Sequence, residues 1–151
     1  MEIRQGGLDH PDVIALLELH FAGMLANSPC GSCHFLDLSG LATPDVTFWT
    51  IWDGETLLGC GAVKEIAPDH GEIKSMRTAP AALRRGVGRK MLAHILKTAG
   101  ERGYARLSLE TGTGAAFDAA HALYRAHGFE ACGPFGDYVA SEFNVFMTKV
   151  L

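Results

Sequence analysis

The sequence predicts a mixed α/β fold in which helices flank one sheet. Residues 46–52 are rich in β-branched and aromatic residues, and a hairpin turn and two further strand-like segments follow up to residue 78, which is typical of antiparallel strands. Apolar residues then recur at helical spacing, and a strand, a second helix and a last strand follow. Strand-helix-strand order indicates a parallel pair within the sheet. A length of 151 residues with 48% hydrophobic residues suits one domain over residues 1–151.

The N-terminal third predicts a short strand, a helix and a loop. Residues 2–5 are strand-like, and Asp9 is the candidate N-cap of a helix with Pro11 in its first turn. Apolar residues recur at helical spacing from Val13 onward, and the helix is expected to end before Pro29. Turn formers dominate residues 30–45, which predict a loop or a short helix.

The central segments predict a three-stranded antiparallel meander. The first two strands cover residues 46–52 and 57–66, joined by a hairpin turn at Asp53-Gly54. A turn at residues 67–70 leads to a third strand over residues 71–78. These three strands are expected to be neighbours in the sheet.

The C-terminal half predicts alternating helices and strands. One helix begins near Val87 and closes near Gly103, and a strand follows over residues 105–111. A helix over residues 115–127 ends at Gly128, and residues 145–151 form a last strand.

Charge divides the chain unequally. Residues 1–70 carry two cations and ten anions, a net charge of −8, whereas residues 71–151 carry eleven cations and seven anions, a net charge of +4. The C-terminal half therefore suits an anionic ligand and the N-terminal half suits a cationic or neutral one. The total of −4 argues against a nucleic-acid partner. No secretory signal and no long apolar run is visible, so a cytoplasmic protein without a membrane partner is expected.

The chain has four cysteines, and two of them form the pattern Cys30-Gly31-Ser32-Cys33-His34. This pattern also occurs at haem attachment sites, redox pairs and zinc sites. Export would be needed for haem, and no second pair completes a four-thiolate zinc site. We therefore expect thiols in an ordinary loop and no metal, with a thiol redox or metal protein as the less favoured alternative.

A candidate phosphate site lies where a strand gives way to a helix, in the segment LRRGVGRK at residues 83–90. The first N–H groups of a helix have no intrahelical acceptor and carry the positive end of the dipole, so they bind phosphate oxygens. A nucleotide P-loop would need Gly-Lys-Ser/Thr, and a dinucleotide fingerprint would need a small residue where Met91 stands. Nucleotide hydrolysis and hydride transfer are therefore disfavoured.

Two segments carry a resemblance to a known family. Residues 73–90, IKSMRTAPAALRRGVGRK, resemble motif A of the GCN5-related N-acetyltransferases (GNAT), and residues 120–129, AHALYRAHGF, resemble motif B. The resemblance implies a twisted, mostly antiparallel sheet of six to seven strands with a splayed parallel pair in its centre, flanked by about four helices. It also implies acetyl-CoA as co-substrate, an amine of a small molecule or protein as acceptor, and a tendency to form homodimers.

The resemblance also assigns co-substrate contacts to residues of this chain. Backbone amides from Arg84 through Arg85, Gly86, Val87 and Gly88 to Arg89 would hold the CoA pyrophosphate. The strand edge at Met76, Arg77 and Thr78 would pair with the pantetheine arm, as a peptide adds to a sheet. Leu83 and Phe117 stand where the family often has Gln or Arg and Asn, respectively.

The reaction needs a base, because a lysine-like amine with a pKa near ~10.4 is mostly protonated at pH 7. Glu72 is the first candidate, directly or through a water, on the condition that burial raises its pKa. Glu110 on the next strand is the second candidate. Tyr124 matches the family tyrosine that donates a proton or hydrogen bond to the leaving thiolate.

No sequence motif marks the binding site of the acetyl acceptor. The resemblance implies that the loop after the first helix forms one wall of the acceptor site, so His34 and Phe35 are expected to contact the acceptor. Glu110 is expected to project toward the same site. His121 and His127 are expected to be helix-surface residues beside Tyr124. A CoA-binding regulator without turnover is the main alternative to an enzyme.

Overall fold

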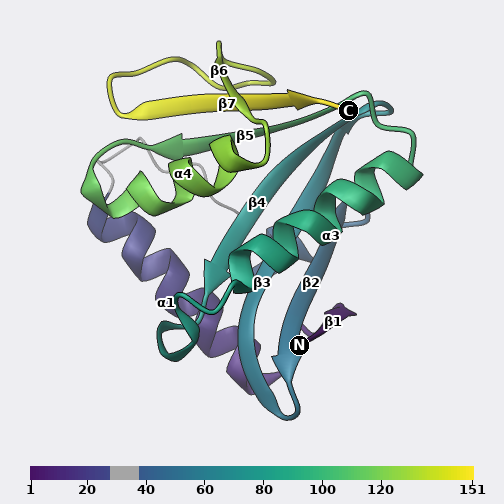
Figure 1. The fold of residues 1–151 in the computed structure, drawn as a ribbon, viewed down its shortest axis with the longest axis vertical. Coiled ribbons are helices and arrows are strands. Elements are labelled where there is room, and N and C mark those ends of the chain that lie inside the picture. The colour runs from purple at the N-terminus through teal and green to yellow at the C-terminus, as the bar shows by residue number, and fades with distance from the viewer. Residues whose placement is uncertain (28–37) are drawn as a thin grey trace.

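A computed structural model describes residues 1–27 and 38–151 (Figure 1). Seven strands and four α-helices are joined by loops and by two 3-10 turns within these ranges. The strands are β1 (Glu2–Gln5), β2 (Val46–Asp53), β3 (Thr56–Ala67), β4 (His70–Thr78), β5 (Arg106–Gly112), β6 (Glu130–Cys132) and β7 (Asn144–Val150). The helices are α1 (Pro11–Asn27), α2 (Leu38–Leu41), α3 (Val87–Glu101) and α4 (Asp118–Ala126), and the 3-10 turns are η1 (Pro80–Ala82) and η2 (Ala115–Phe117).

The strands form one sheet in the order β1-β2-β3-β4-β5-β7-β6. All neighbours are antiparallel except β4 and β5, which are parallel. This confirms the predicted fold class: a mostly antiparallel mixed sheet with one parallel pair, flanked by helices. The three strands β2, β3 and β4 form the antiparallel meander that was predicted for residues 46–78.

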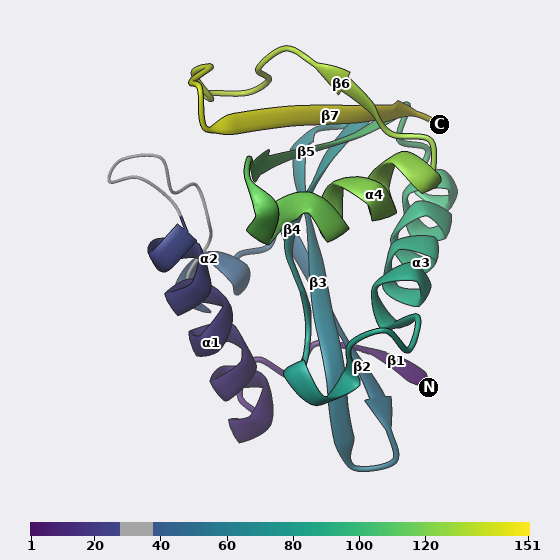
Figure 2. The same cartoon turned by 60° about the vertical axis from the view of Figure 1, so that its left-hand side comes forward.

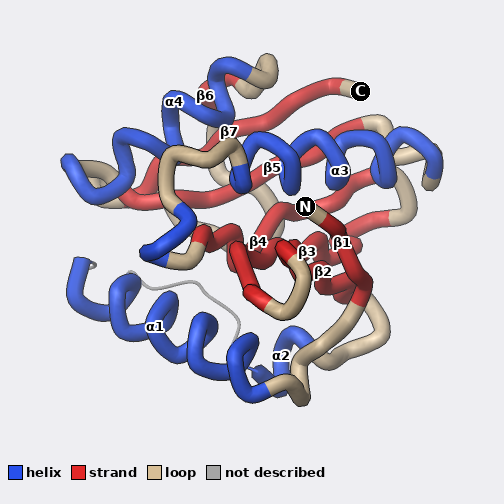
Figure 3. Tube along the Cα trace, turned by 60° about the horizontal axis from the view of Figure 1, so that its bottom comes forward, coloured by secondary structure: helices blue, strands red, loops and turns tan. Residues whose placement is uncertain are grey.

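Helices cover both faces of the sheet (Figures 2 and 3). On one face α1 and α2 pack against β2 and β3, through apolar side chains that include Leu17, Leu41 and Trp52. On the other face α3 and α4 pack through side chains that include Leu92, Ile95 and Tyr124. Burial of these two apolar layers is the main driving force for the fold. None of the helices in residues 1–27 and 38–151 has both the length and the apolarity needed to cross a membrane.

The secondary structure predicted from the sequence differs from the structure in the C-terminal part of the chain. The predicted helix over residues 115–127 is divided into η2 and α4, and the strand β6 was not predicted. A strand of three residues is too short to show an alternation of apolar and polar positions. It exists because it pairs with residues Phe146–Thr148 of β7, a contact that only the tertiary structure supplies.

The parallel pair opens shortly after it forms. β4 and β5 pair over only three positions, with Glu72 opposite Ser108 as the last. β4 continues to Thr78, and a register shift against β3 accompanies a left-handed backbone at Ser75, with φ at 53°. A bulge of this kind turns the strand and changes which side chains share a face. The strand edge at residues 76–78 therefore lies outside the paired part of β4 and β5.

Gly59 holds β3 close to β4 and α3, which gives a first prediction. A Cβ at this position would lie 2.7 Å from the Arg77 carbonyl oxygen and 2.9 Å from Val87 Cγ1. We expect Gly59→Ala to lower the free energy of unfolding by about 1–3 kcal/mol, because backbone must move to make room. Gly100→Ala is the matched control: a Cβ there meets nothing within 4 Å, and alanine favours the helix. Urea denaturation of both variants tests this, and an equal loss in both would contradict it.

Candidate active site

The segment between β4 and α3 forms an open helix start. Gly86, at the N-cap of α3, has a left-handed backbone with φ at 78°, and no side chain caps the helix. The first N–H groups after it have no acceptor within the helix, since Lys90 is the residue whose amide bonds to the Gly86 carbonyl. Arg84, Arg85 and Arg89 are exposed around this turn. The predicted phosphate cradle thus has the geometry and charge that bind anions.

A cavity of about 470 Å³ adjoins this turn. It runs from the helix start along the β4 edge to α4. Of the residues predicted to contact the co-substrate, this cavity brings together Met76, Arg77, Thr78, Val87 and Gly88. Arg85 instead reaches toward Asp53, 3.6 Å away at the protein surface.

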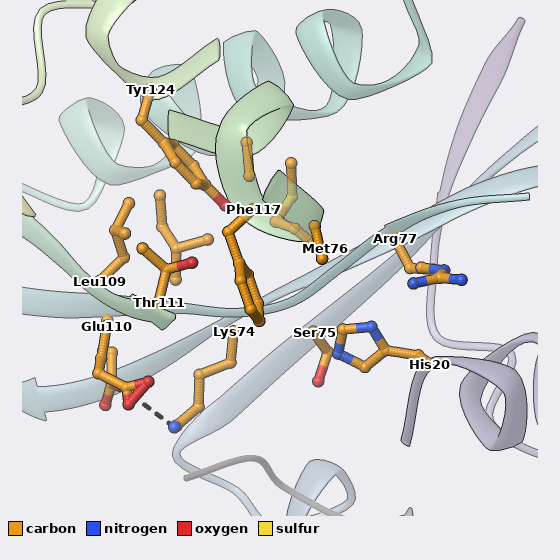
Figure 4. A pocket seen from close by; sticks show the side chains of 14 residues that line it. His20, Lys74, Ser75, Met76, Arg77, Leu109, Glu110, Thr111, Phe117 and Tyr124 are labelled. Atoms are coloured by element: carbon orange, nitrogen blue, oxygen red, sulfur yellow. Dashed lines mark ion pairs between the residues drawn. The ribbon is translucent and has the colours of Figure 1, made fainter. Parts of the chain in front are cut away.

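A second cavity of about 190 Å³ lies where β4 and β5 separate (Figure 4). Both cavities are lined by Met76, Arg77, Ala116, Ala120 and Tyr124. Figure 4 shows Glu110 and Lys74 toward one end of the second cavity and His20 and Arg77 toward the other. A molecule in one cavity would therefore meet a molecule in the other beside Tyr124.

Tyr124 lies on the inner face of α4. Its ring packs edge-on against Phe129, and Figure 4 shows its hydroxyl directed into the second cavity. Burial raises the pKa of Tyr124 well above its ordinary value, so the phenol stays neutral and keeps its proton for donation. Tyr124, the residue that the resemblance singled out, therefore lies where the two cavities meet.

Glu72 is buried and belongs to a cluster of three residues. Tyr138 donates a hydrogen bond of 2.5 Å to Glu72 Oε2, and Lys74 Nζ lies 3.2 Å from the same oxygen. Lys74 Nζ also donates to the Tyr138 hydroxyl at 2.8 Å. Burial and the neighbouring Glu72 raise the pKa of Tyr138, so this phenol is neutral as well. Sequence reasoning missed Tyr138, because it stands 66 residues from Glu72 in the loop before β7, where no motif marks it.

Glu110 lines the same cavity from β5, on the opposite strand face from the buried Leu107 and Leu109. Both candidate bases, Glu72 and Glu110, thus line one cavity. Sequence reasoning also missed His20, Thr111 and Phe117 as lining residues. In the sequence, Phe117 stands out only as a departure from the family pattern.

Some of the predicted site residues lie outside the described residues, and one prediction of surface exposure was wrong. His34 and Phe35, predicted for the acceptor site, and Cys30 and Cys33 lie outside the described residues. The prediction that His121 is a helix-surface residue was wrong. Its side chain is buried and its Nε2 lies 2.8 Å from the Gly112 carbonyl oxygen, so it ties α4 to the end of β5.

His20 gives a prediction for pH dependence. Burial, and then the charge of Arg77, lowers the pKa of His20 from near 6.5 to about 4. Between these values the unfolded chain binds the proton that the folded chain excludes, so stability decreases as pH falls from 6.5 toward 4. We expect this residue alone to cost about 2 kcal/mol between pH 7 and about pH 4.5. Urea denaturation at both pH values should show a smaller difference for His20→Gln, and an unchanged difference would contradict the assignment.

Taken together, these features define a class of protein. An uncapped helix start with exposed arginines, a strand edge beyond the paired part of β4 and β5, and a phenol between two joined cavities suit a transferase that carries its activated group on a long phosphate-bearing arm. Comparison with known proteins makes the class specific. The model of the acetyltransferase (GNAT) family matches residues 16–129. The chain belongs to this family, and it is an N-acyltransferase that moves an acyl group from an acyl-CoA to an amine.

Two curated relatives match nearly the whole chain. A protein of Escherichia coli called uncharacterized N-acetyltransferase YedL is 51% identical over 99% of this chain and 94% of its own length. A protein of Bacillus subtilis called uncharacterized N-acetyltransferase YsnE is 48% identical over the full length of both chains.

Solved structures share the fold. A Klebsiella pneumoniae structure, provisionally described as an acyl-CoA N-acyltransferase, has a TM-score of 0.83 at 29% identity, with 99% of this chain and 97% of that chain covered. A Bacillus subtilis acetyltransferase solved in complex with CoA has a TM-score of 0.71 at 18% identity, with 99% and 98% covered.

Proposed function

We propose that this enzyme transfers an acetyl group from acetyl-CoA to an amine by direct attack within a ternary complex. The observation that carries the proposal is the meeting of two cavities at Met76, Arg77 and Tyr124. One cavity leads from the anion-binding turn, and the other leads from the buried carboxylate Glu72. Donor and acceptor can therefore be bound at the same time, with the thioester carbon between them.

In this proposal the donor is held mainly by backbone. The N–H groups from Arg84 to Arg89 bind the pyrophosphate, and the pantetheine amides pair with the β4 edge at residues 76–78. The CoA bound in the B. subtilis structural neighbour supports the nature of the donor. The larger cavity volume of about 470 Å³ supports the position of the arm.

The acceptor amine must lose a proton as its nitrogen attacks the thioester carbonyl. We assign the base role to Glu72, directly or through a water, with Glu110 as the alternative on the same cavity. A carbon–nitrogen bond forms and the carbon–sulfur bond breaks, so the electron pair leaves on the CoA sulfur. Backbone N–H groups near Arg77 and Thr78 would stabilise the oxyanion that forms between these steps.

Tyr124 would act on the leaving sulfur. A thiol has a reference pKa near ~8.5, below that of a buried phenol, so complete proton transfer from Tyr124 to the thiolate is uphill. A hydrogen bond from the neutral phenol stabilises the thiolate without that cost. We therefore propose that Tyr124 is a hydrogen-bond donor in the transition state and that solvent delivers the final proton to CoA.

Thiol release tests the proposal against its main alternative, a regulator that binds CoA without turnover. Acetyl-CoA is mixed with the protein and a panel of amines and amino acids, and free CoA is followed with a thiol reagent. We expect calorimetric binding of CoA together with amine-dependent release. Binding without release for any acceptor would favour the regulator, and no binding would contradict both functions.

Location and assembly complete the proposal. We propose a cytoplasmic enzyme whose cysteines are thiols, and the described Cys60 and Cys132 are not in a disulfide. A homodimer is a further expectation, which sedimentation velocity over a range of concentrations tests. A single species at about 16 kDa at all concentrations would contradict it.

A further inference from the structure

One end of the second cavity, where the acceptor is proposed to bind, carries polar atoms that have no hydrogen-bond partner within the described part of the chain. His20 and Ser75 are each 8% exposed, and both line this cavity. His20 Nδ1 and Ser75 Oγ are buried atoms that have no hydrogen-bond partner in the structure. Buried polar atoms are nearly always paired, and an unpaired one costs about 1–3 kcal/mol. Two such atoms at one place therefore point to a ligand that pairs with them.

Arg77 brings a positive charge to the same place. Its side chain extends toward α1, where a Cβ on Gly23 would lie 3.6 Å from Arg77 Nη1 (Figure 4). Among residues 1–27 and 38–151, no carboxylate lies within ion-pair distance of this guanidinium. The nearby imidazole of His20 is neutral at pH 7, since burial lowers its pKa to about 4. We call His20, Ser75 and Arg77 the donor corner.

The donor corner has the chemistry of an oxyanion site. A guanidinium offers N–H groups only, a serine hydroxyl donates readily, and a neutral imidazole donates from one ring nitrogen. Hydrogen bonds from such groups to a carboxylate are among the strongest that side chains make. The corner is also partly desolvated, which strengthens the attraction for a negative charge.

The rest of the cavity favours a positively charged group on the ligand. The acidic residues Glu72 and Glu110 line it, and Lys74 lies beside Glu72. With Arg77, the cavity carries two anionic and two cationic side chains, which suits an occupant that is itself zwitterionic rather than a polycation. Ser75 and Glu72 are three residues apart on β4, a distance of roughly 10 Å or less at about 3.3 Å per residue. A small molecule can span that distance.

We propose that the acetyl acceptor is an amine that also carries a carboxylate, namely a free amino acid or a close analogue, and that His20, Ser75 and Arg77 bind this carboxylate. This inference rests on the proposed function. It assigns a specificity role to the Arg77 side chain, which is separate from the role proposed for its backbone at the donor edge. Binding the carboxylate there would orient the amine toward the thioester beside Tyr124.

Matched acceptors test the inference. Each of a set of amino acids is compared with its own carboxamide and its own decarboxylated amine, with thiol release and product mass as readouts. For the preferred side chain we expect kcat/KM for the amino acid to exceed that of both partners by about tenfold or more. Equal or better turnover of the amides and plain amines would overturn the inference and leave the proposed function standing. No turnover of any member would contradict the proposed function itself.

Variants test whether the donor corner causes the preference for an acceptor with a carboxylate. We expect Arg77→Met to raise KM for the amino acid about tenfold or more and to bring the ratio between amino acid and plain amine toward one. His20→Leu should act in the same direction, and His20→Gln, which keeps a donor, should restore part of the preference. Arg125→Met removes an exposed guanidinium of α4 and is the control that should keep the ratio. An unchanged ratio in both Arg77→Met and His20→Leu would overturn the assignment.

A binding measurement removes the dependence on turnover. The amino acid preferred by the wild type is titrated into the protein saturated with CoA, which holds no acetyl group to transfer. We expect heat of binding with wild type and a weakening of about tenfold or more with Arg77→Met or His20→Leu. Equal binding of the amino acid and its carboxamide to wild type would overturn the inference.

Discussion

Replacing Glu72 by glutamine is expected to remove most of the activity and to destabilise the fold. If Glu72 is the base, kcat/KM should fall by about 10²–10⁴-fold, the usual contribution of general base catalysis. The side chains of Lys74 and Glu72 are 9% and 6% exposed, so the substitution also removes the carboxylate that lies beside a buried ammonium. Breaking one side of such a pair costs about 3 kcal/mol or more. Steady-state kinetics and urea denaturation measure the two effects.

Two further variants separate catalysis from stability. The double variant Glu72→Gln/Lys74→Met removes both charges, and we expect it to regain much of the lost stability without regaining activity. Tyr138→Phe keeps the carboxylate and removes the hydroxyl that donates to it, so a smaller loss of activity is expected. If Glu72→Gln stays active while Glu110→Gln does not, Glu110 is the base.

Replacing Tyr124 by phenylalanine is expected to lower kcat by about 10- to 100-fold with little change in the Kd for acetyl-CoA. The variant keeps the ring that packs against Phe129 and removes only the hydroxyl directed into the cavity. A donor that acts on the departing sulfur strengthens its interaction in the transition state, and its loss therefore appears in kcat rather than in binding.

The pH profile adds a second criterion for Tyr124. Burial raises the pKa of Tyr124 above the ordinary value near ~10, so the phenol does not ionise in the working range. The ratio of wild-type to Tyr124→Phe kcat should then stay constant from about pH 6 to about pH 9. An unaltered kcat, or a weaker Kd that accounts for the whole loss, would remove Tyr124 from the mechanism.

The fold was largely predictable because its elements carry local signals. The β-branched and aromatic residues of β2, the Asp53-Gly54 turn and the apolar period of α3 each report on one element. β6 could not be predicted in this way, because its three residues depend on pairing with β7. The division of residues 115–127 into η2 and α4 was missed as well, since a 3-10 turn shares much of the local pattern of an α-helix.

The candidate site was predictable only where a motif marks it. The segment around Gly86 and the position of Tyr124 follow from short sequence patterns, and the structure places both against the same cavity system. No such pattern marks Lys74 and Tyr138, the partners of Glu72, or the buried His20. They depend on contacts between α1, β4 and the loop before β7, and no spacing along the chain encodes such contacts.

The short pairing between β4 and β5 has a consequence for the stability of the enzyme. Strand pairing joins β4 and β5 at only three positions, and a pantetheine arm bound along the edge of β4 would add contacts beyond them. Ligand at a hundredfold excess over its Kd adds about 2.7 kcal/mol to the stability of a folded protein. We therefore expect bound donor to slow the cleavage of the folded enzyme by proteases.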